Sequence, residues 1–337
     1  MNLYPLRFRP IYKDKIWGGR NLERLYSRPL PLNEKIGESW ELADLEEGTS
    51  VVANGPLSGT TLTELTAQNT SELLGFGKGL ENGRFPLLLK LLDANDMLSL
   101  QVHPDERAVK ELGGSAALKT ECWYIVESRG GFIYKGVKPG VTPDQFRKAI
   151  ENDSVADLCL RFDVADGDFH YLPAGTVHAL GAGVVVAEVQ TPSDTTYRVS
   201  DWGRGRQLHI EESLKCIHFE PPAEPPGQTD VNTLLVTDYF SVMRHTAGRH
   251  EPKSLPSGEC SAMMILSADE LVEIHHRGED EQVVRCKVGD TVLLPASLQE
   301  PLIVSAGRCD WLQVTLPKQA AASQVDSSQE FARRERR

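Results

Sequence analysis

Two histidines of this chain lie in local sequences that could bring them into one metal site. His178 ends residues 167–178, which read as a strand, a Pro-Ala-Gly turn and the first residue of the next strand. His103 follows Ser99 and Gln101 at alternate positions, so all three side chains share one face of a strand. Imidazoles on separate strands, with polar neighbours, are ligands that a metal ion inside a β-barrel requires. The pattern therefore predicts a metal centre between two strands.

A carboxylate that could complete this centre is Glu121, which enters the next predicted strand. Nitrogen and oxygen ligands of this kind suit zinc or a similar divalent ion. A lone histidine is more often a core or surface residue than a ligand, so the hypothesis depends on the set as a whole. We predict that the ligands are His103, Glu121 and His178, with Gln101 as an optional fourth. Lys119 shares the face of Glu121 and is expected to point into the same pocket.

Short strands are expected to position these residues. Their segments are 39–43, 87–92, 97–103, 122–126, 131–135, 184–189, 234–237, 262–266, 283–288 and 291–294. Gly, Pro, Asn and Asp turns separate them, which favours a sandwich or barrel over an alternating β/α sheet. Helices are expected over residues 61–74, 142–150 and 210–219, with capping boxes beginning at Thr61 and Thr142.

One sequence pattern occurs twice. The series Gly-Asp-x3-Leu-Pro-Ala begins at Gly167 and again at Gly289, each time after an apolar strand. In the second copy Glu300 takes the place of His178. A duplication that keeps the turn and loses the histidine predicts two barrels, of which only the first carries chemistry.

The sequence is expected to divide into four parts. Residues 1–220 are expected to form the catalytic domain, and the Pro-rich residues 221–230 a linker that is neither helix nor central strand. Residues 231–317 are expected to form the second, degenerate barrel. Residues 318–337 are rich in Ala, Ser and Gln with a basic end, and are expected to be a disordered tail.

Composition limits the partners. The 337 residues include 36 basic and 48 acidic side chains, a net charge of −12, which argues against nucleic acid or an anionic membrane as the partner. No run approaches the roughly 20 apolar residues of a membrane helix, and the six cysteines are widely spaced. We expect a cytoplasmic protein with reduced thiols, as a monomer or a homodimer, acting on a small molecule. An Asp/Arg segment over residues 194–204 could provide local charge for an anionic substrate.

Several ordered motifs resemble the type I mannose-6-phosphate isomerases in their short form, within the cupin superfamily. The cupin signature Gly-x5-Pro-x-Gly-x2-His lies on residues 167–178, although Ala182 stands where that signature ends in Asn. The more specific motifs are at residues 16–19, 37–41, 85–90, 99–104 and 119–121. The resemblance covers roughly residues 5–220.

This resemblance implies an all-β fold of two cupin-type jelly-roll barrels, the second degenerate, with a few short helices. It also implies one zinc ion per chain and the interconversion of mannose 6-phosphate and fructose 6-phosphate. The proton would move between C1 and C2 through a cis-enediolate. The family's zinc ligands match His103, Glu121, His178 and Gln101.

The resemblance assigns further roles. The family's essential arginine matches Arg198. The reaction also needs a base that reaches the proton on C1 or C2, for which Lys119 and Asp194 are the two candidates, and the sequence does not choose between them. The phosphate-binding residues match Lys90, Ser99 and Arg204, although longer members carry lysine at the last of these positions.

Two other functions are compatible with such a barrel. A regulatory or non-catalytic sugar-phosphate-binding paralogue would keep the fold and lose catalytic residues, yet both Arg198 and Lys119 are present. A cupin dioxygenase would carry a histidine-rich first signature, but Gln101 occupies the place of its first histidine. An isomerase is therefore the favoured hypothesis.

Overall fold

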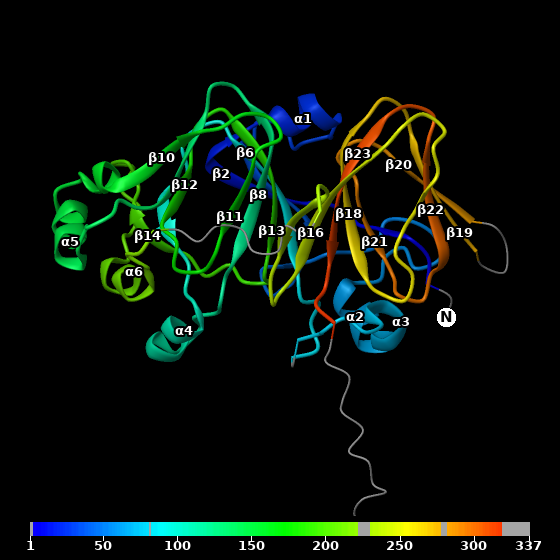
Figure 1. Ribbon diagram of the computed structural model, residues 1–337, viewed down its shortest axis with the longest axis horizontal. Helices are drawn as coiled ribbons and strands as arrows, with labels where there is room; N and C mark the ends of the chain where they lie inside the picture. Colours follow the sequence, from blue (N-terminus) through cyan, green and yellow to red (C-terminus); the bar gives the residue numbers. More distant parts are fainter. Residues whose placement is uncertain (1–2, 81, 222–229, 278–281, 319–337) are drawn as a thin grey trace, which may run out of the picture.

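Two β-barrels packed against each other form the fold of the computed structural model, which describes residues 3–80, 82–221, 230–277 and 282–318 (Figure 1). Each barrel has one larger and one smaller antiparallel sheet. The predicted all-β architecture of two jelly-roll barrels with a few short helices is confirmed. The predicted linker and tail lie almost wholly outside the described residues.

The first barrel consists of eight consecutive strands in jelly-roll order. Its larger sheet pairs the first, eighth, third and sixth of them, and its smaller sheet the second, seventh, fourth and fifth. In chain order these strands are β6 (Leu88–Ala94), β7 (Leu100–Val102), β8 (Glu121–Ser128), β9 (Phe132–Val137), β10 (Cys159–Asp163), β11 (Phe169–Leu172), β12 (His178–Leu180) and β13 (Val184–Gln190). The flanking strands β2 (Ile11–Gly19), β3 (Ile36–Leu42) and β14 (Tyr197–Ser200) extend these sheets.

The second barrel repeats the same order. The sheet β21-β18-β23-β16 corresponds to β11-β8-β13-β6, and β20-β19-β22-β17 corresponds to β10-β9-β12-β7. Its strands are β16 (Ser241–Ala247), β17 (Lys253–Ser254), β18 (Ser261–Ala268), β19 (Val272–Arg277), β20 (Gln282–Cys286), β21 (Thr291–Leu294), β22 (Gln299–Ser305) and β23 (Cys309–Thr315), with β15 (Thr233–Val236) at one edge. The duplication predicted from the sequence is therefore present in the topology.

The N-terminal strand crosses between the barrels. β1 (Leu6–Arg7) pairs with β21 of the second barrel, while β2 and β3 belong to the first. A short hairpin, β4 (Asp44–Leu45) and β5 (Gly48–Thr49), follows β3. The chain therefore contributes to the second barrel before it builds the first.

One apolar core lies between the two larger sheets. Leu89, Tyr124 and Val189 from the first barrel share it with Leu312 and Val314 of β23. Separate clusters fill the interior of each barrel. The barrels are therefore joined by burial of apolar surface, the dominant favourable term in packing. All six cysteines are buried and free, as expected.

Short helices cover the barrels' ends and one outer face. They are α1 (Asn21–Tyr26), α2 (Leu62–Gln68), α3 (Thr70–Leu74), α4 (Glu106–Leu112), α5 (Pro143–Glu151) and α6 (Ile210–Cys216), with a 3-10 turn over Val155–Leu158. Figure 1 places α5 and α6 beside the smaller sheet of the first barrel, where they share a core with Leu100 and Val102. Both predicted capping boxes form, but two helices replace the single helix expected over residues 61–74. Among the described residues, no helix has the length and apolar character needed to cross a membrane.

The repeated turn has the same hydrogen bonds in both barrels. Gly167 donates its N–H to the carbonyl of Ile125 at 2.8 Å, and Gly289 donates to Ile265 at 2.8 Å. Both glycines have a positive φ, +90° and +84°, which L side chains rarely adopt. The glycine is therefore required by the turn itself and not by the metal site.

Substitution of these two glycines should separate backbone strain from crowding. Gly167→Ala is expected to lower the free energy of unfolding by about 1–2 kcal/mol, the strain of a left-handed alanine. Gly289→Ala is expected to lose about 1–3 kcal/mol more from overpacking, because its Cβ would lie 2.5 Å from the Tyr26 ring. Urea denaturation of the two variants provides the comparison. Equal losses would show that Tyr26 moves aside freely.

Candidate metal centre

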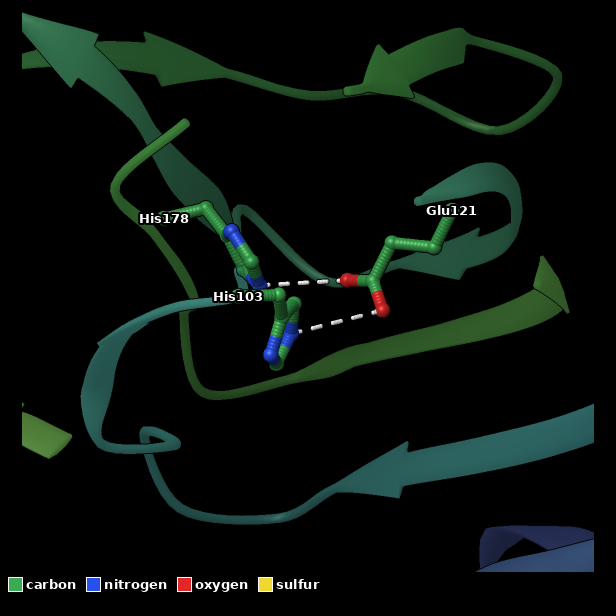
Figure 2. A group of neighbouring side chains, drawn as sticks. All are labelled: His103, Glu121 and His178. Carbon is green, nitrogen blue, oxygen red and sulfur yellow. Dashed lines mark ion pairs between the residues drawn. The ribbon is translucent and has the colours of Figure 1, made fainter. Parts of the chain in front are cut away.

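Three buried side chains converge inside the first barrel (Figure 2). His103 follows the end of β7, while Glu121 and His178 are the first residues of β8 and β12. Nε2 of His178 lies 3.1 Å from Oε1 of Glu121, and Nε2 of His103 lies 3.5 Å from Oε2. Their ligand atoms all lie within 4.8 Å of one another. The structure thus brings together the three residues that the sequence placed in one site.

Backbone carbonyls determine which nitrogen of each imidazole faces the carboxylate. Nδ1 of His103 lies 2.8 Å from the carbonyl oxygen of Thr195, and Nδ1 of His178 lies 2.9 Å from that of Thr176. Because a carbonyl can only accept, each Nδ1 carries a hydrogen, and in the neutral imidazole Nε2 then keeps its lone pair. Histidines that bind metals have this arrangement.

The Pro-Ala-Gly turn connects the two histidine segments. The N–H of Gly175 donates to the carbonyl of His103 at 2.9 Å. Gly175 has a φ of +88°, and an added Cβ would lie 2.7 Å from the ring of His218. Glycine is therefore required here by both conformation and space. The turn that precedes His178 also holds the backbone of His103.

Lys119 and Gln101 contact the cluster. Nζ of Lys119 lies 3.0 Å from Oε2 of Glu121 and 3.1 Å from Nε2 of His103. Nε2 of Gln101 lies 3.3 Å from Nε2 of His178. Burial opposes ionisation of Glu121, but Lys119 and the two imidazoles hold the pKa of this carboxyl well below its usual range. Burial, together with the Lys119 ammonium, keeps the pKa of His103 well below its usual range.

This donor set fits a divalent metal ion. Metal binding requires an ionised carboxylate and neutral imidazoles, and these pKa shifts favour both for Glu121 and His103. Both carboxylate oxygens of Glu121 are buried, and their charged or polar neighbours are Lys119 and the two imidazoles. Catalytic zinc sites use three protein ligands and keep one position open. The group could therefore hold a metal ion, with the amide of Gln101 within reach.

A cavity of about 280 Å³ opens beside the metal centre. Its lining includes six residues that the sequence analysis selected, which are Lys90, Ser99, Gln101, Lys119, Asp194 and Arg198. The indole of Trp123 also lines it and lies edge-on to His178, with ring centroids 5.4 Å apart. His103, Glu121 and His178 are not part of this lining, but Gln101 and Lys119 both line the cavity and contact them, so the cavity and the cluster are adjacent.

Arg204 lies outside the lining of this cavity. Its guanidinium donates to the carbonyl of Met97 at 2.7 Å and pairs with Asp201 at 3.0 Å. Arg206 pairs with the same carboxylate and does line the cavity. Arg206, and not Arg204, therefore lines the cavity together with Arg198. One residue of irregular backbone, Gly205, separates them, and side-chain type alone gave no basis for the choice.

A series of alternating charges forms one wall of the cavity, and sequence reasoning missed most of it. Nζ of Lys15 lies 3.0 Å from Glu38, and Nζ of Lys90 lies 3.7 Å from Glu38 and 3.4 Å from Glu188. Burial and the charge of Glu121 raise the pKa of Glu188. The sequence did contain a signal for Glu188, because it is the one charged residue of the apolar strand β13, and a buried charge requires a partner.

Acidification should weaken the contribution of Glu38 to stability. Burial alone would raise its pKa, but Lys90 and Lys15 lower it to about 2. A depressed carboxyl pKa stabilises the fold above the unfolded pKa of about 4.3, and the effect is lost as pH falls towards 2. The difference in unfolding free energy between wild type and Glu38→Gln should be about 3 kcal/mol at pH 7 and about 2 kcal/mol at pH 3.5. Urea denaturation at both pH values measures it. A difference that grows on acidification would contradict this sign.

Comparison with known protein families and sequences gives a consistent set of relatives. Residues 6–124 match the family model for the catalytic domain of type I phosphomannose isomerase. A probable mannose-6-phosphate isomerase of Bacillus subtilis, GmuF, is 35% identical over 324 residues, which are 92% of this chain and 98% of that relative. The mannose-6-phosphate isomerase of Streptococcus mutans is 40% identical over 252 residues, covering 71% of this chain and 78% of that protein.

Solved structures agree with these sequences. The mannose 6-phosphate isomerase of Bacillus subtilis has a TM-score of 0.80 at 30% identity, and the match covers 92% of this chain and 99% of that one. A putative mannosephosphate isomerase from Archaeoglobus fulgidus shares the fold, with a TM-score of 0.74 at 21% identity over 93% of this chain and 97% of that one. The likeness extends across both barrels.

Proposed function

Since this chain belongs to the type I phosphomannose isomerase family and is therefore an aldose–ketose isomerase, we propose that it interconverts mannose 6-phosphate and fructose 6-phosphate with one bound zinc ion. The observation that supports this most directly is the buried group of His103, Glu121 and His178 beside a charged cavity. These three residues, with Gln101 as the fourth ligand, would hold the zinc ion. When bound, the ion would stabilise the negative charge that develops on the substrate oxygens.

Arg198 and Arg206 are proposed to orient the anionic parts of the substrate. In the described part of the chain Arg198 forms no ion pair, and its Nη1 donates to the carbonyl of Gln207 at 2.8 Å. Its remaining donors are available to the substrate oxygens on C1 and C2, on which negative charge develops, and its own positive charge is permanent. We assign the phosphate to Arg206 and Ser99. Lys90 already lies between two carboxylates, so we assign it a hydrogen bond to the substrate beside them.

The proton transfer needs a base that reaches C1 and C2. Lys119 forms an ion pair with Glu121 at 3.0 Å, and a charged ammonium has no lone pair with which to accept a proton. Asp194 lines the same cavity as an exposed carboxylate, and the described residues give it no ion pair. We therefore assign to Asp194 the removal of the C2 proton of mannose 6-phosphate and its return to C1, while the hydroxyl proton on O2 passes to O1. Lys119 would stabilise the cis-enediolate that forms between these steps.

A coupled assay tests this function. Purified protein is given mannose 6-phosphate, and fructose 6-phosphate is measured before and after removal of metal by a chelator and after zinc is restored. We expect turnover that is lost with the metal and recovered with zinc. Full turnover by metal-stripped protein would overturn the metal's role. Binding of mannose 6-phosphate without turnover by the zinc-loaded protein would support the non-catalytic paralogue instead.

A further inference from the structure

Strand β3 has different contacts on its two faces. Glu38 lines the cavity and accepts a hydrogen bond from Nε1 of Trp40 at 2.7 Å. Successive residues of a strand point to opposite faces, so Ser39 and Glu41 lie on the other side. There Oγ of Ser39 donates to Oε1 of Glu41 at 2.6 Å. A displacement of Ser39 and Glu41 would therefore also move Glu38, because all three belong to the same short strand.

Arg28 connects that second face to the second barrel. Its guanidinium donates to the two carboxylate oxygens of Glu41 at 2.6 and 2.9 Å, and to Oγ of Ser39 at 2.8 Å. Nη2 also donates to the backbone carbonyl of Gly289. Arg28, Ser39 and Glu41 are at most 6% exposed. A buried, two-pronged arginine–carboxylate pair has a fixed geometry, which distinguishes it from a surface ion pair.

The two copies of the repeated turn have different surroundings. At Gly289 the turn lies against Tyr26, whose ring would be 2.5 Å from an added Cβ. At Gly167 the nearest atom to an added Cβ is the hydroxyl of Tyr124, at 3.7 Å. The turn that precedes His178 in the first barrel therefore has a second use in the second barrel, where it packs against Tyr26 and accepts a hydrogen bond from Arg28.

We infer that Arg28 is a positioning residue for substrate binding, through which the second barrel holds β3 and places the Glu38 carboxylate at the cavity wall. Glu38 contacts Lys15 at 3.0 Å and lies 3.7 Å from Lys90, so a shift of β3 would alter this part of the cavity. The metal ligands lie on other segments and would keep their positions. This inference rests on the proposed function, because the substrate of that reaction reports the change.

Arg28→Lys is the first variant to test it. Lysine keeps the charge but cannot bind both oxygens of Glu41 and the carbonyl of Gly289 in the same geometry. We expect KM for mannose 6-phosphate to rise about five-fold or more while kcat stays within about two-fold, the pattern of lost binding common to ground and transition states. Zinc content should remain one per chain. Glu41→Gln should show the same separation of KM from kcat.

Two further variants separate positioning from stability. Val272→Ala removes volume from the interior of the second barrel, far from β3 in the fold, and should lower the melting temperature without a change in KM. The double variant Arg28→Met/Glu41→Leu replaces both members of the buried pair by apolar side chains. Such a replacement often leaves the free energy of unfolding unchanged, whereas removal of one partner lowers it strongly. If the single variants fail to fold, KM can still be measured for this double variant, and it should be raised.

The outcomes are distinguishable. A raised KM with unchanged zinc in the Arg28 and Glu41 variants, and an unchanged KM in Val272→Ala, supports the inference. An unchanged KM in Arg28→Lys and in the double variant overturns it. If the wild type shows no turnover, the proposed function fails first. Calorimetric titration of mannose 6-phosphate into the same proteins then decides the inference by the dissociation constant.

Discussion

Glu121→Gln should leave a protein that no longer retains its metal ion, with kcat lowered roughly 10³-fold or more, because a metal ion contributes several kcal/mol to transition-state stabilisation. Glu121 is the one carboxylate of the buried group, and the Nε2 atoms of His103 and His178 both face it. The amide keeps the size of the side chain but removes the charge that balances Lys119. Metal content after dialysis and kcat for mannose 6-phosphate are the two measurements.

The same strand provides a matched control. Glu127→Gln makes the identical change further along β8, where the carboxylate pairs with Arg24 and Arg129 at the surface. It should leave zinc content and kcat unchanged. Gln101→Ala should weaken zinc binding less than Glu121→Gln does, because it removes a neutral ligand. Full zinc occupancy and full activity in Glu121→Gln would remove this residue from the proposed metal site.

Arg198→Ala should lower kcat by roughly 10²–10³-fold while zinc stays bound, the effect typical of removing one donor that stabilises an oxyanion. Arg198 lines the cavity, and its Nε is buried without a hydrogen-bond partner among the described residues. Arg198→Lys should lie between wild type and alanine, since it keeps the charge and loses the planar fork. Steady-state kinetics with zinc-loaded protein measures all three.

A surface arginine controls for loss of charge in general. Arg147 pairs with Glu211 on exposed helices, so Arg147→Ala should retain the wild-type kcat and KM. An Arg198→Ala protein that lost zinc as well as activity would place the arginine's effect on the metal and not on the substrate. Wild-type kcat in Arg198→Ala would exclude it from the chemistry.

The cluster of His103, Glu121 and His178 and the repeat of the barrel could be predicted because local sequence patterns indicate both. Alternation placed Gln101 and His103 on one face, and the turn glycines fixed where His178 begins its strand. The Thr61 and Thr142 capping boxes likewise depend on residues three positions apart.

The wall formed by Lys15, Glu38 and Glu188 depends instead on pairing between distant strands. Glu38 and Lys90 approach because β3 pairs with β6, and Glu188 joins them because β13 pairs with β6 on its other side. No local pattern encodes that register. The crossing of β1 into the second barrel was unpredictable for the same reason, since its partner β21 lies at the far end of the chain.

The apolar core between the two larger sheets determines where this chain cannot be cut. A fragment ending near residue 221 would leave Tyr124, Val189 and their neighbours facing water, and β1 without β21. An exposed apolar sheet face of this kind promotes aggregation. The second barrel thus keeps an apolar face of the first barrel out of water, so the two barrels can be inherited or transplanted only together.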